Sequence, residues 1–175
     1  MARRLPDPGL FTISLLSRTE RDEAAAIALI EERIGPIALR SPAHEFPWTS
    51  YYRDEAGESP IRRYLSLGQL LPREELPDRK RLTIALEAEL SGGGPRPVNV
   101  DAGCLTQGQL FLASTKDQKQ RVYAGNGVYV EPTLYYQDGA WHSFPWSYPD
   151  YSSPVALEWL EASRALLRRL LAARS

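Results

Sequence analysis

The residues best suited to form a site are concentrated in one stretch, residues 98–151, where acids, cations and tyrosines interrupt apolar runs typical of strands. Lys and Arg in a loop suit a phosphate or carboxylate group, and paired carboxylates suit proton transfer or a Mg²⁺ ion. We therefore predict catalytic roles for Asp101 and Glu131. The predicted ligand-binding residues are Lys116, Asp117, Arg121, Tyr123, Trp146, Tyr148, Asp150 and Tyr151.

Each of these predictions has a structural alternative. Glu131 interrupts the apolar run VYVEPTLYY, and a carboxylate buried there needs a cation, which could be Lys116, Arg121, or Arg62 and Arg63. The loop STKDQKQR has the composition of an exposed turn as well as of an anion site. The block PWSYPDY can wall a pocket or attach a helix to the sheet, and we expect Asp150 and Tyr151 to be its exposed members.

The sequence lacks the residue patterns that several common cofactors and catalytic sites require. One cysteine, Cys104, and two separated histidines, His44 and His142, provide no zinc, haem or disulfide pattern. Neither a phosphate loop nor a glycine-rich nicotinamide fingerprint is present. We expect Cys104 to be a small, partly buried residue and both histidines to serve packing or the surface. The cofactor stays unknown, and Mg²⁺ is the metal that carboxylates without His or Cys would suit.

Length and charge bound the remaining classes. The 175 residues fit one domain, and a net charge of −1 provides no global attraction for nucleic acid. No apolar run approaches the roughly 20 residues that a membrane span needs, and the N-terminal residues lack a signal-peptide pattern. We expect a cytoplasmic protein with no membrane partner.

The first part of the chain predicts a βαββαβ order. Thr19, with Asp22 three residues on, resembles a capping box, and Gly35-Pro36 ends the helix that it starts. The other predicted elements are strands 10–17, 37–40 (resuming near Glu45), 61–71 and 97–101, an aromatic strand or loop at 48–52, a polar loop at 53–60, and a helix at 78–90. This order is the ferredoxin-like unit, whose right-handed crossovers place both helices on one face of the sheet.

Three cations, Arg79, Lys80 and Arg81, stand in the first turn of the second predicted helix, where positive charge opposes the helix dipole. They form either a solvated turn offset by nearby acids or, with the free N–H groups of the helix, an anion site.

Turn signals organise the rest. Residues 109–114 form a helix or a strand, while Asn126-Gly127 and Asp138-Gly139 predict hairpins linking strands 121–124, 128–137 and 140–144. Ser153-Pro154 starts a helix to about residue 173. The predicted fold class is therefore α+β in a single domain, residues 1–175. It comprises a ferredoxin-like core (about 10–101), a charged loop with an added β-hairpin extension (about 102–151) and a C-terminal helix (about 154–173).

The segments VNVDAGCLT, LASTKD, RVYAGNGVYVEPTLYY and above all PWSYPDY resemble the DUF4416 family of prokaryotic proteins of unknown function. LFTISLLS and RKRLTIALEAEL are also similar to it, so the resemblance covers nearly the whole chain. The sequence departs from the family pattern at Cys104, Gln109 and Gln120. The resemblance implies no established activity.

Three functions from different classes stay open, and the sequence does not decide whether the protein is an enzyme. The first is binding of a small anionic ligand, which is a nucleotide or a phosphate-bearing metabolite. This function can include chemistry on the ligand that a divalent metal assists. The second is RNA binding on an open sheet face. The third is a non-catalytic assembly role through a homodimer. The RNA hypothesis uses Tyr51, Tyr52, Tyr64, Tyr123 and Tyr135 for stacking, with Arg62, Arg63 and residues 79–81 for phosphates.

Overall fold

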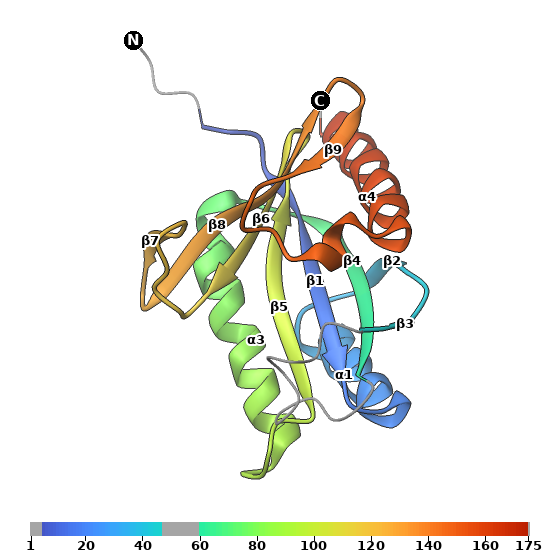
Figure 1. Ribbon diagram of the computed structural model, residues 1–175, viewed down its shortest axis with the longest axis vertical. Helices are drawn as coiled ribbons and strands as arrows, with labels where there is room; N and C mark the ends of the chain where they lie inside the picture. Colours follow the sequence, from blue (N-terminus) through green and yellow to red (C-terminus); the bar gives the residue numbers. More distant parts are fainter. Residues whose placement is uncertain (1–4, 47–59, 175) are drawn as a thin grey trace.

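The computed structural model describes residues 5–46 and 60–174. In this part the protein has a mixed α/β architecture, in which nine antiparallel strands form one sheet and three α-helices pack against it (Figure 1). The aromatic segment predicted at 48–52 and the polar loop predicted at 53–60, except for its last residue, lie outside the described residues.

The strands and helices follow one another as the turn and cap signals indicate. The strands are β1 (Gly9–Ser17), β2 (Ile37–Arg40), β3 (His44–Glu45), β4 (Ile61–Leu71), β5 (Val98–Leu105), β6 (Gln109–Ser114), β7 (Val122–Gly125), β8 (Val128–Gln137) and β9 (Ala140–Ser143). The helices are α1 (Glu20–Arg33), α3 (Leu76–Ser91) and α4 (Pro154–Ala172), with 3-10 turns η2 (Arg73–Glu75) and η3 (Pro149–Ser152). The sheet order is β2-β4-β1-β5-β6-β8-β7, with β3 also on β4 and β9 also on β8.

Local signals place most elements correctly. The Thr19 hydroxyl caps α1 by accepting the Asp22 N–H at 3.1 Å. Asn126 and Asp138 adopt φ values of 55° and 51°, as hairpin turns before glycine require. The ambiguous segment at 109–114 is a strand, β6. Strand β5 was expected to end at residue 101, but it continues to Leu105 because its last residues pair with β6.

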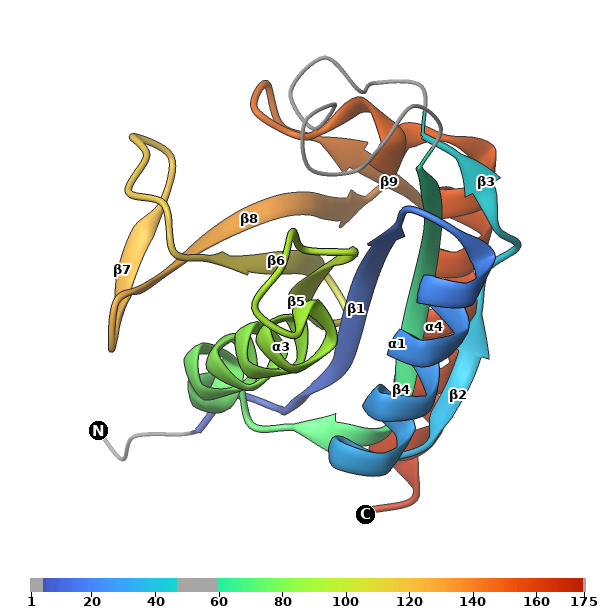
Figure 2. The same ribbon diagram turned by 90° about the horizontal axis from the view of Figure 1, so that it is seen from below.

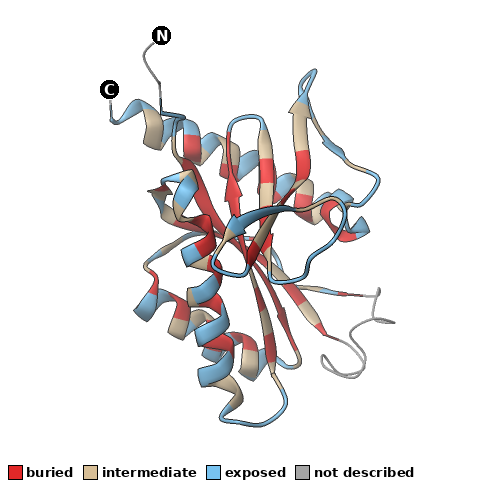
Figure 3. Ribbon diagram, turned by 90° about the vertical axis from the view of Figure 1, so that its left-hand side faces the viewer, coloured by how far each residue is buried: buried red, intermediate tan, exposed pale blue. Residues whose placement is uncertain are grey.

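The sheet is covered on both faces over its centre. Strand β1 is buried along its whole length, and its Phe11, Ile13 and Leu15 belong to the apolar cluster under α1 and α3. Its Leu10 belongs to a second apolar cluster, which also contains Leu160 of α4. Figure 2 shows α1 and α3 on one side of β1 and β4, with α4 behind them. Buried residues accordingly follow the central strands in Figure 3.

This second layer changes one expectation about the sheet face. Tyr64, considered as a stacking platform for RNA, is completely buried, and its ring stacks on Trp159 of α4 at 5.1 Å. The face that would present it to bases is therefore occupied by the final helix.

The predicted hairpin extension is real, but it continues the same sheet. Strand β6 pairs with both β5 and β8, and β8 pairs with β7 and β9. The sheet is therefore larger than a four-stranded unit. None of the described helices is long and apolar enough to cross a membrane.

Strands β5 and β6 run together for only a short distance. Among the described residues they pair from Gly103 to Leu105 on β5, opposite Leu112 to Leu110 on β6. The earlier part of β5 stays beside β1, whereas β6 leaves with β8, so the two strands diverge (Figures 1 and 2). The resulting opening lies next to α3.

If α4 is a structural layer, truncating its inward face should destabilise the protein. We expect Leu160→Ala to lower the free energy of unfolding by about 2–5 kcal/mol, because Leu160 is fully buried. The neighbouring exposed Glu161→Ala should change it by no more than about 0.5 kcal/mol. Urea denaturation measures both, and equal effects would contradict this packing.

Candidate functional site

The opening between β5 and β6 forms a polar cleft of about 120 Å³, here called the β5–β6 cleft. Five of the residues predicted from sequence line it: Asp101, Lys116, Arg121, Glu131 and Tyr148. Its other lining residues are Lys80, Ile84, Glu87, Arg96, Asn99, Leu112, Ala113, Ser114 and Thr115. Four of the lining side chains are cationic and three are acidic, which leaves one positive charge in excess.

Helix α3 supplies the groups that replace a neighbouring strand at the mouth of the divergence. The Val100 N–H donates to Glu87 Oε1 at 2.6 Å, and Lys80 Nζ donates to the Val100 carbonyl at 3.3 Å. Lys80 and Glu87 are seven residues apart and therefore lie on one face of the helix. Because buried backbone groups must be paired, these two side chains make the divergence of β5 from β6 tolerable.

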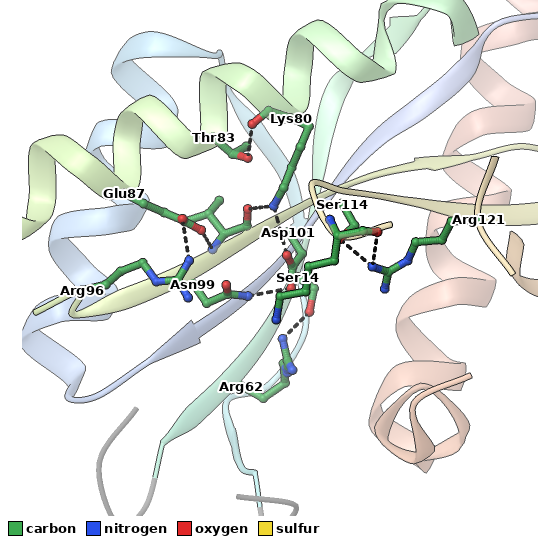
Figure 4. A network of polar contacts seen from close by, with 12 residues as sticks. Ser14, Arg62, Lys80, Thr83, Glu87, Arg96, Asn99, Asp101, Ser114 and Arg121 are labelled. Atoms are coloured by element: carbon green, nitrogen blue, oxygen red, sulfur yellow. Dashed lines mark hydrogen bonds and ion pairs between the residues drawn. The ribbon is translucent and has the colours of Figure 1, made fainter. Parts of the chain in front are cut away.

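Asp101 faces the cleft from β5 and is held by two donors. Lys80 Nζ lies 3.1 Å from its Oδ1, and Asn99 Nδ2 donates to its Oδ2 at 2.6 Å (Figure 4). Partial burial favours the neutral acid, but Lys80, Arg62 and the two hydrogen bonds outweigh it, so the pKa of Asp101 lies below its usual value. Asp101 is thus an anion that orients Lys80.

The pKa of Glu87 is shifted in the opposite direction to that of Asp101. Its side chain is 6% exposed and also pairs with Arg96 at 2.9 Å. Burial raises the pKa of Glu87, and this effect exceeds the stabilisation of the carboxylate by the Val100 N–H, Lys80 and Arg96. The two acids that hold Lys80 and the edge of β5 therefore respond differently to pH.

Arg121 organises the far wall of the cleft. Its Nε donates to Glu131 Oε2 at 2.8 Å, and the two side chains are 6% and 3% exposed. Its Nη1 donates to Ser114 Oγ at 2.8 Å and to the Lys116 carbonyl at 3.0 Å, so it fixes the loop after β6 (Figure 4). Of the cations considered as partners of Glu131, Arg121 is the one that pairs with it.

The PWSYPDY block behaves differently from its predicted exposure. Asp150 is completely buried and Tyr151 is 3% exposed, whereas Trp146 and Tyr148 are the exposed aromatic members. The expectation was wrong because Asp150 has buried partners on β4. Tyr64 donates its hydroxyl to Asp150 Oδ2 at 2.9 Å, and Arg62 Nε lies 3.3 Å from the same oxygen, without the alignment of a hydrogen bond.

The phenols of Tyr64 and Tyr151 also belong to this buried group. Burial, followed by the Asp150 carboxylate, raises the pKa of Tyr64 and of Tyr151, so both phenols remain neutral. Arg62 also donates to Ser14 Oγ at 2.6 Å (Figure 4) and lies over the Phe46 ring at 4.6 Å. Asp150 therefore anchors η3 to the sheet and does not line the cleft.

Three other predicted ligand-binding residues lie outside the cleft lining. Asp117 is exposed in the loop after β6, and Tyr123 is on β7, where its ring meets Tyr129 at 5.2 Å. Trp146 donates its Nε1 to the Pro132 carbonyl at 2.8 Å. The structure therefore gathers half of the ten predicted residues and separates the others.

Sequence reasoning missed the residues that α3 contributes. Lys80 was considered only with Arg79 and Arg81 at the helix start, yet it is buried while those two pair with Glu75 and Asp78. The available signal was the seven-residue spacing of Lys80 and Glu87 beside the apolar face of the helix.

Metal-ligand chemistry finds little support in the described part of the chain. No group of three or more His, Cys, Asp and Glu side chains is placed there to hold a metal ion. Asp101 and Glu131 share the cleft, but Lys80 and Arg121 occupy their oxygens. Cys104 is 1% exposed, and burial raises the pKa of its thiol to about 11.

Two larger hollows lack such a convergence of charged groups. One, of about 650 Å³, lies between Asp7 and the end of α4 near Arg168. The other, of about 300 Å³, is mainly apolar and is lined by Cys104, Phe111 and Val130. The β5–β6 cleft is therefore the candidate site.

The buried Arg121–Glu131 pair predicts strong coupling. Arg121→Met or Glu131→Leu alone should lower the free energy of unfolding by about 3–5 kcal/mol, because each leaves a buried charge unpaired. The double variant should lose less than the sum, and urea denaturation of all four proteins measures the difference. Additive effects within about 0.5 kcal/mol would show that the pair is not coupled.

The two acids predict opposite pH effects. The lowered pKa of Asp101 contributes stability above its unfolded value of about 3.9, and this is lost as the pH falls through the folded value. The raised pKa of Glu87 contributes stability below about 4.3, and this is lost as the pH rises through the folded value.

Asp101→Asn should therefore flatten the rise in stability at acid pH, whereas Glu87→Gln should remove a decline above about pH 4.3. Denaturant unfolding from about pH 3 to 7 compares the variants with the wild type. Profiles that change in the same direction would contradict this assignment.

The comparison with known proteins yields one family. The chain matches no curated protein and no solved structure. The model of DUF4416, described as a domain of unknown function, matches residues 7–166. This match includes both strands that border the cleft and the whole PWSYPDY block. The chain therefore belongs to the DUF4416 family.

Proposed function

We propose that this protein binds a small anionic ligand, a phosphate- or carboxylate-bearing metabolite, in the β5–β6 cleft. The observation that carries the proposal is the convergence of Lys80, Arg96, Lys116 and Arg121 on one hollow. These cations come from three parts of the chain, namely α3, the segment before β5 and the loop between β6 and β7.

Unused hydrogen-bond donors support binding beyond the internal ion pairs. Lys80 has three N–H donors, of which two contact the Val100 carbonyl and Asp101. Arg121 uses its Nε and Nη1 groups, and within the described residues its Nη2 group has no hydrogen-bond partner. An anion would accept these donors without breaking the pairs that orient them.

In this proposal Asp101 and Glu131 position cations. Their carboxylates hold Lys80 and Arg121, and the ordering of these long side chains is accomplished before a ligand arrives. This is the role that we assign to them in place of proton transfer or Mg²⁺ coordination.

The size of the cleft limits what enters it. The hollow measures about 120 Å³, several times the roughly 10–15 Å³ that one water molecule needs, so it has room for one phosphate or carboxylate group. A whole metabolite would place its anionic head in the cleft and its remainder at the mouth.

We also propose that β1, α1, β2, β4, α3 and β5 form a ferredoxin-like unit that scaffolds the cleft. Support comes from the neighbour order β2-β4-β1-β5 and from the shared apolar cluster under α1 and α3. Because this fold serves many functions, the functional proposal rests on the cleft alone.

Two lysines of one loop provide a matched test. Lys116 lines the cleft, whereas the exposed Lys119 does not. Titration calorimetry with inorganic phosphate, at an ionic strength matched with chloride, should show saturable binding to the wild type. Lys116→Gln should weaken it roughly twofold to fivefold, the effect of one exposed charge, and Lys119→Gln should not.

Equal melting temperatures of the two variants would establish that folding is unaffected. Absence of phosphate binding to the wild type would overturn the proposal. Equal weakening by both substitutions would indicate diffuse surface attraction and would overturn the location of the site.

A further inference from the structure

The segment between β9 and α4 crosses the sheet between two fixed points. At its first point, Trp146 donates to the Pro132 carbonyl and Ser147 donates its hydroxyl to the Thr133 carbonyl, which attaches the segment to β8. The Trp146 ring also stacks on Phe144 at 4.9 Å with an interplanar angle of 3°. This attachment begins one residue after Glu131 of the cleft wall.

The second fixed point lies on the other side of the cleft. Asp150, completely buried, is held by Tyr64 and Arg62 of β4, and Arg62 reaches Ser14 of β1. The segment therefore passes from β8 to β4 within five residues. Its two attachments fix the chain on either side of Tyr148.

Tyr148 is the residue left between these attachments. Pro149 restricts it to an extended backbone, with φ −65° and ψ 136°. Its ring lines the β5–β6 cleft yet is 41% exposed, and its side chain has no hydrogen-bond or ring partner within the described residues. An aromatic ring at the mouth of a cationic cleft, on a backbone segment attached on either side, is thus available to a ligand.

We propose that Tyr148 forms a stacking wall for the part of the ligand that leaves the cleft, and that the ligand class is a phosphate monoester with a flat, unsaturated body. This inference rests on the proposed function, because it requires the phosphate group in the cleft. Asp150 acts as a positioning residue, since it fixes η3 and thereby the chain that follows Tyr148.

The chemistry of the wall favours a flat body over an aliphatic one. A tyrosine face attracts another π-system or a polarised heterocycle, and stacking of a base on an aromatic side chain contributes substantially to binding. Because every base offers a π-face, the wall should accept different heterocycles. Accessible probes of this class are nucleoside monophosphates, and ribose 5-phosphate is the matched compound without the heterocycle.

Titration calorimetry with inorganic phosphate, ribose 5-phosphate, AMP and CMP tests the proposal. The wild type should bind AMP and CMP at least about fivefold more tightly than ribose 5-phosphate, as base stacking on an aromatic side chain predicts. Tyr148→Ala should remove this preference, whereas Tyr148→Phe should retain it. Tyr123→Ala is the matched control, because Tyr123 is exposed on β7 outside the cleft lining.

The outcomes separate the two proposals. Phosphate binding without a preference for the nucleotides would overturn the stacking wall and leave the anion site standing. A preference that survives in Tyr148→Ala, or that Tyr123→Ala also removes, would overturn the role of Tyr148. Failure of every probe to bind the wild type would overturn both proposals.

Discussion

The divergence of β5 from β6 is the constraint on which the rest of the structure depends. Where two strands separate inside a sheet, their backbone groups lose partners and must find others, because unpaired buried groups are costly. Val100 finds a carboxylate oxygen and an ammonium on α3, from Glu87 and Lys80. The solution brings opposite charges into the opening, and the charged character of the cleft follows from it.

Each charge brought into the opening requires a further partner. Lys80 is 7% exposed at its side chain and is paired with Asp101, while Glu87 is paired with Arg96. On the other wall, Arg121 and Glu131 satisfy each other and fix the loop after β6. Lys80 and Arg121 are consequently held in place but retain donors, which is the arrangement that lowers the ordering cost of binding an anion.

The buried Asp150 fixes the position of one strand pair relative to a distant strand of the sheet. Its contacts with Tyr64 and Arg62 tie the end of the β8–β9 ribbon to β4, across the strands that border the cleft. Buried ionic groups are expensive to desolvate, so we interpret this group as a determinant of position more than of stability. It explains why the PWSYPDY block contains a buried acid close to exposed aromatic residues.

The sequence alone determined the elements whose signals are local. The Thr19 cap, the Asn126 and Asp138 turns and the unbroken apolar run of β1 each act within a few residues, and the structure confirms them. The resemblance to the family could also be recognised from short motifs.

The assembly of five predicted residues into one cleft, however, needed the pairing of β5, β6 and β8. Only the tertiary structure decided that Lys80 is a cleft residue and that Asp150 is buried, because burial depends on partners far apart in the chain. The same holds for the β5–β6 opening, since the point at which two strands separate is set by the sheet as a whole.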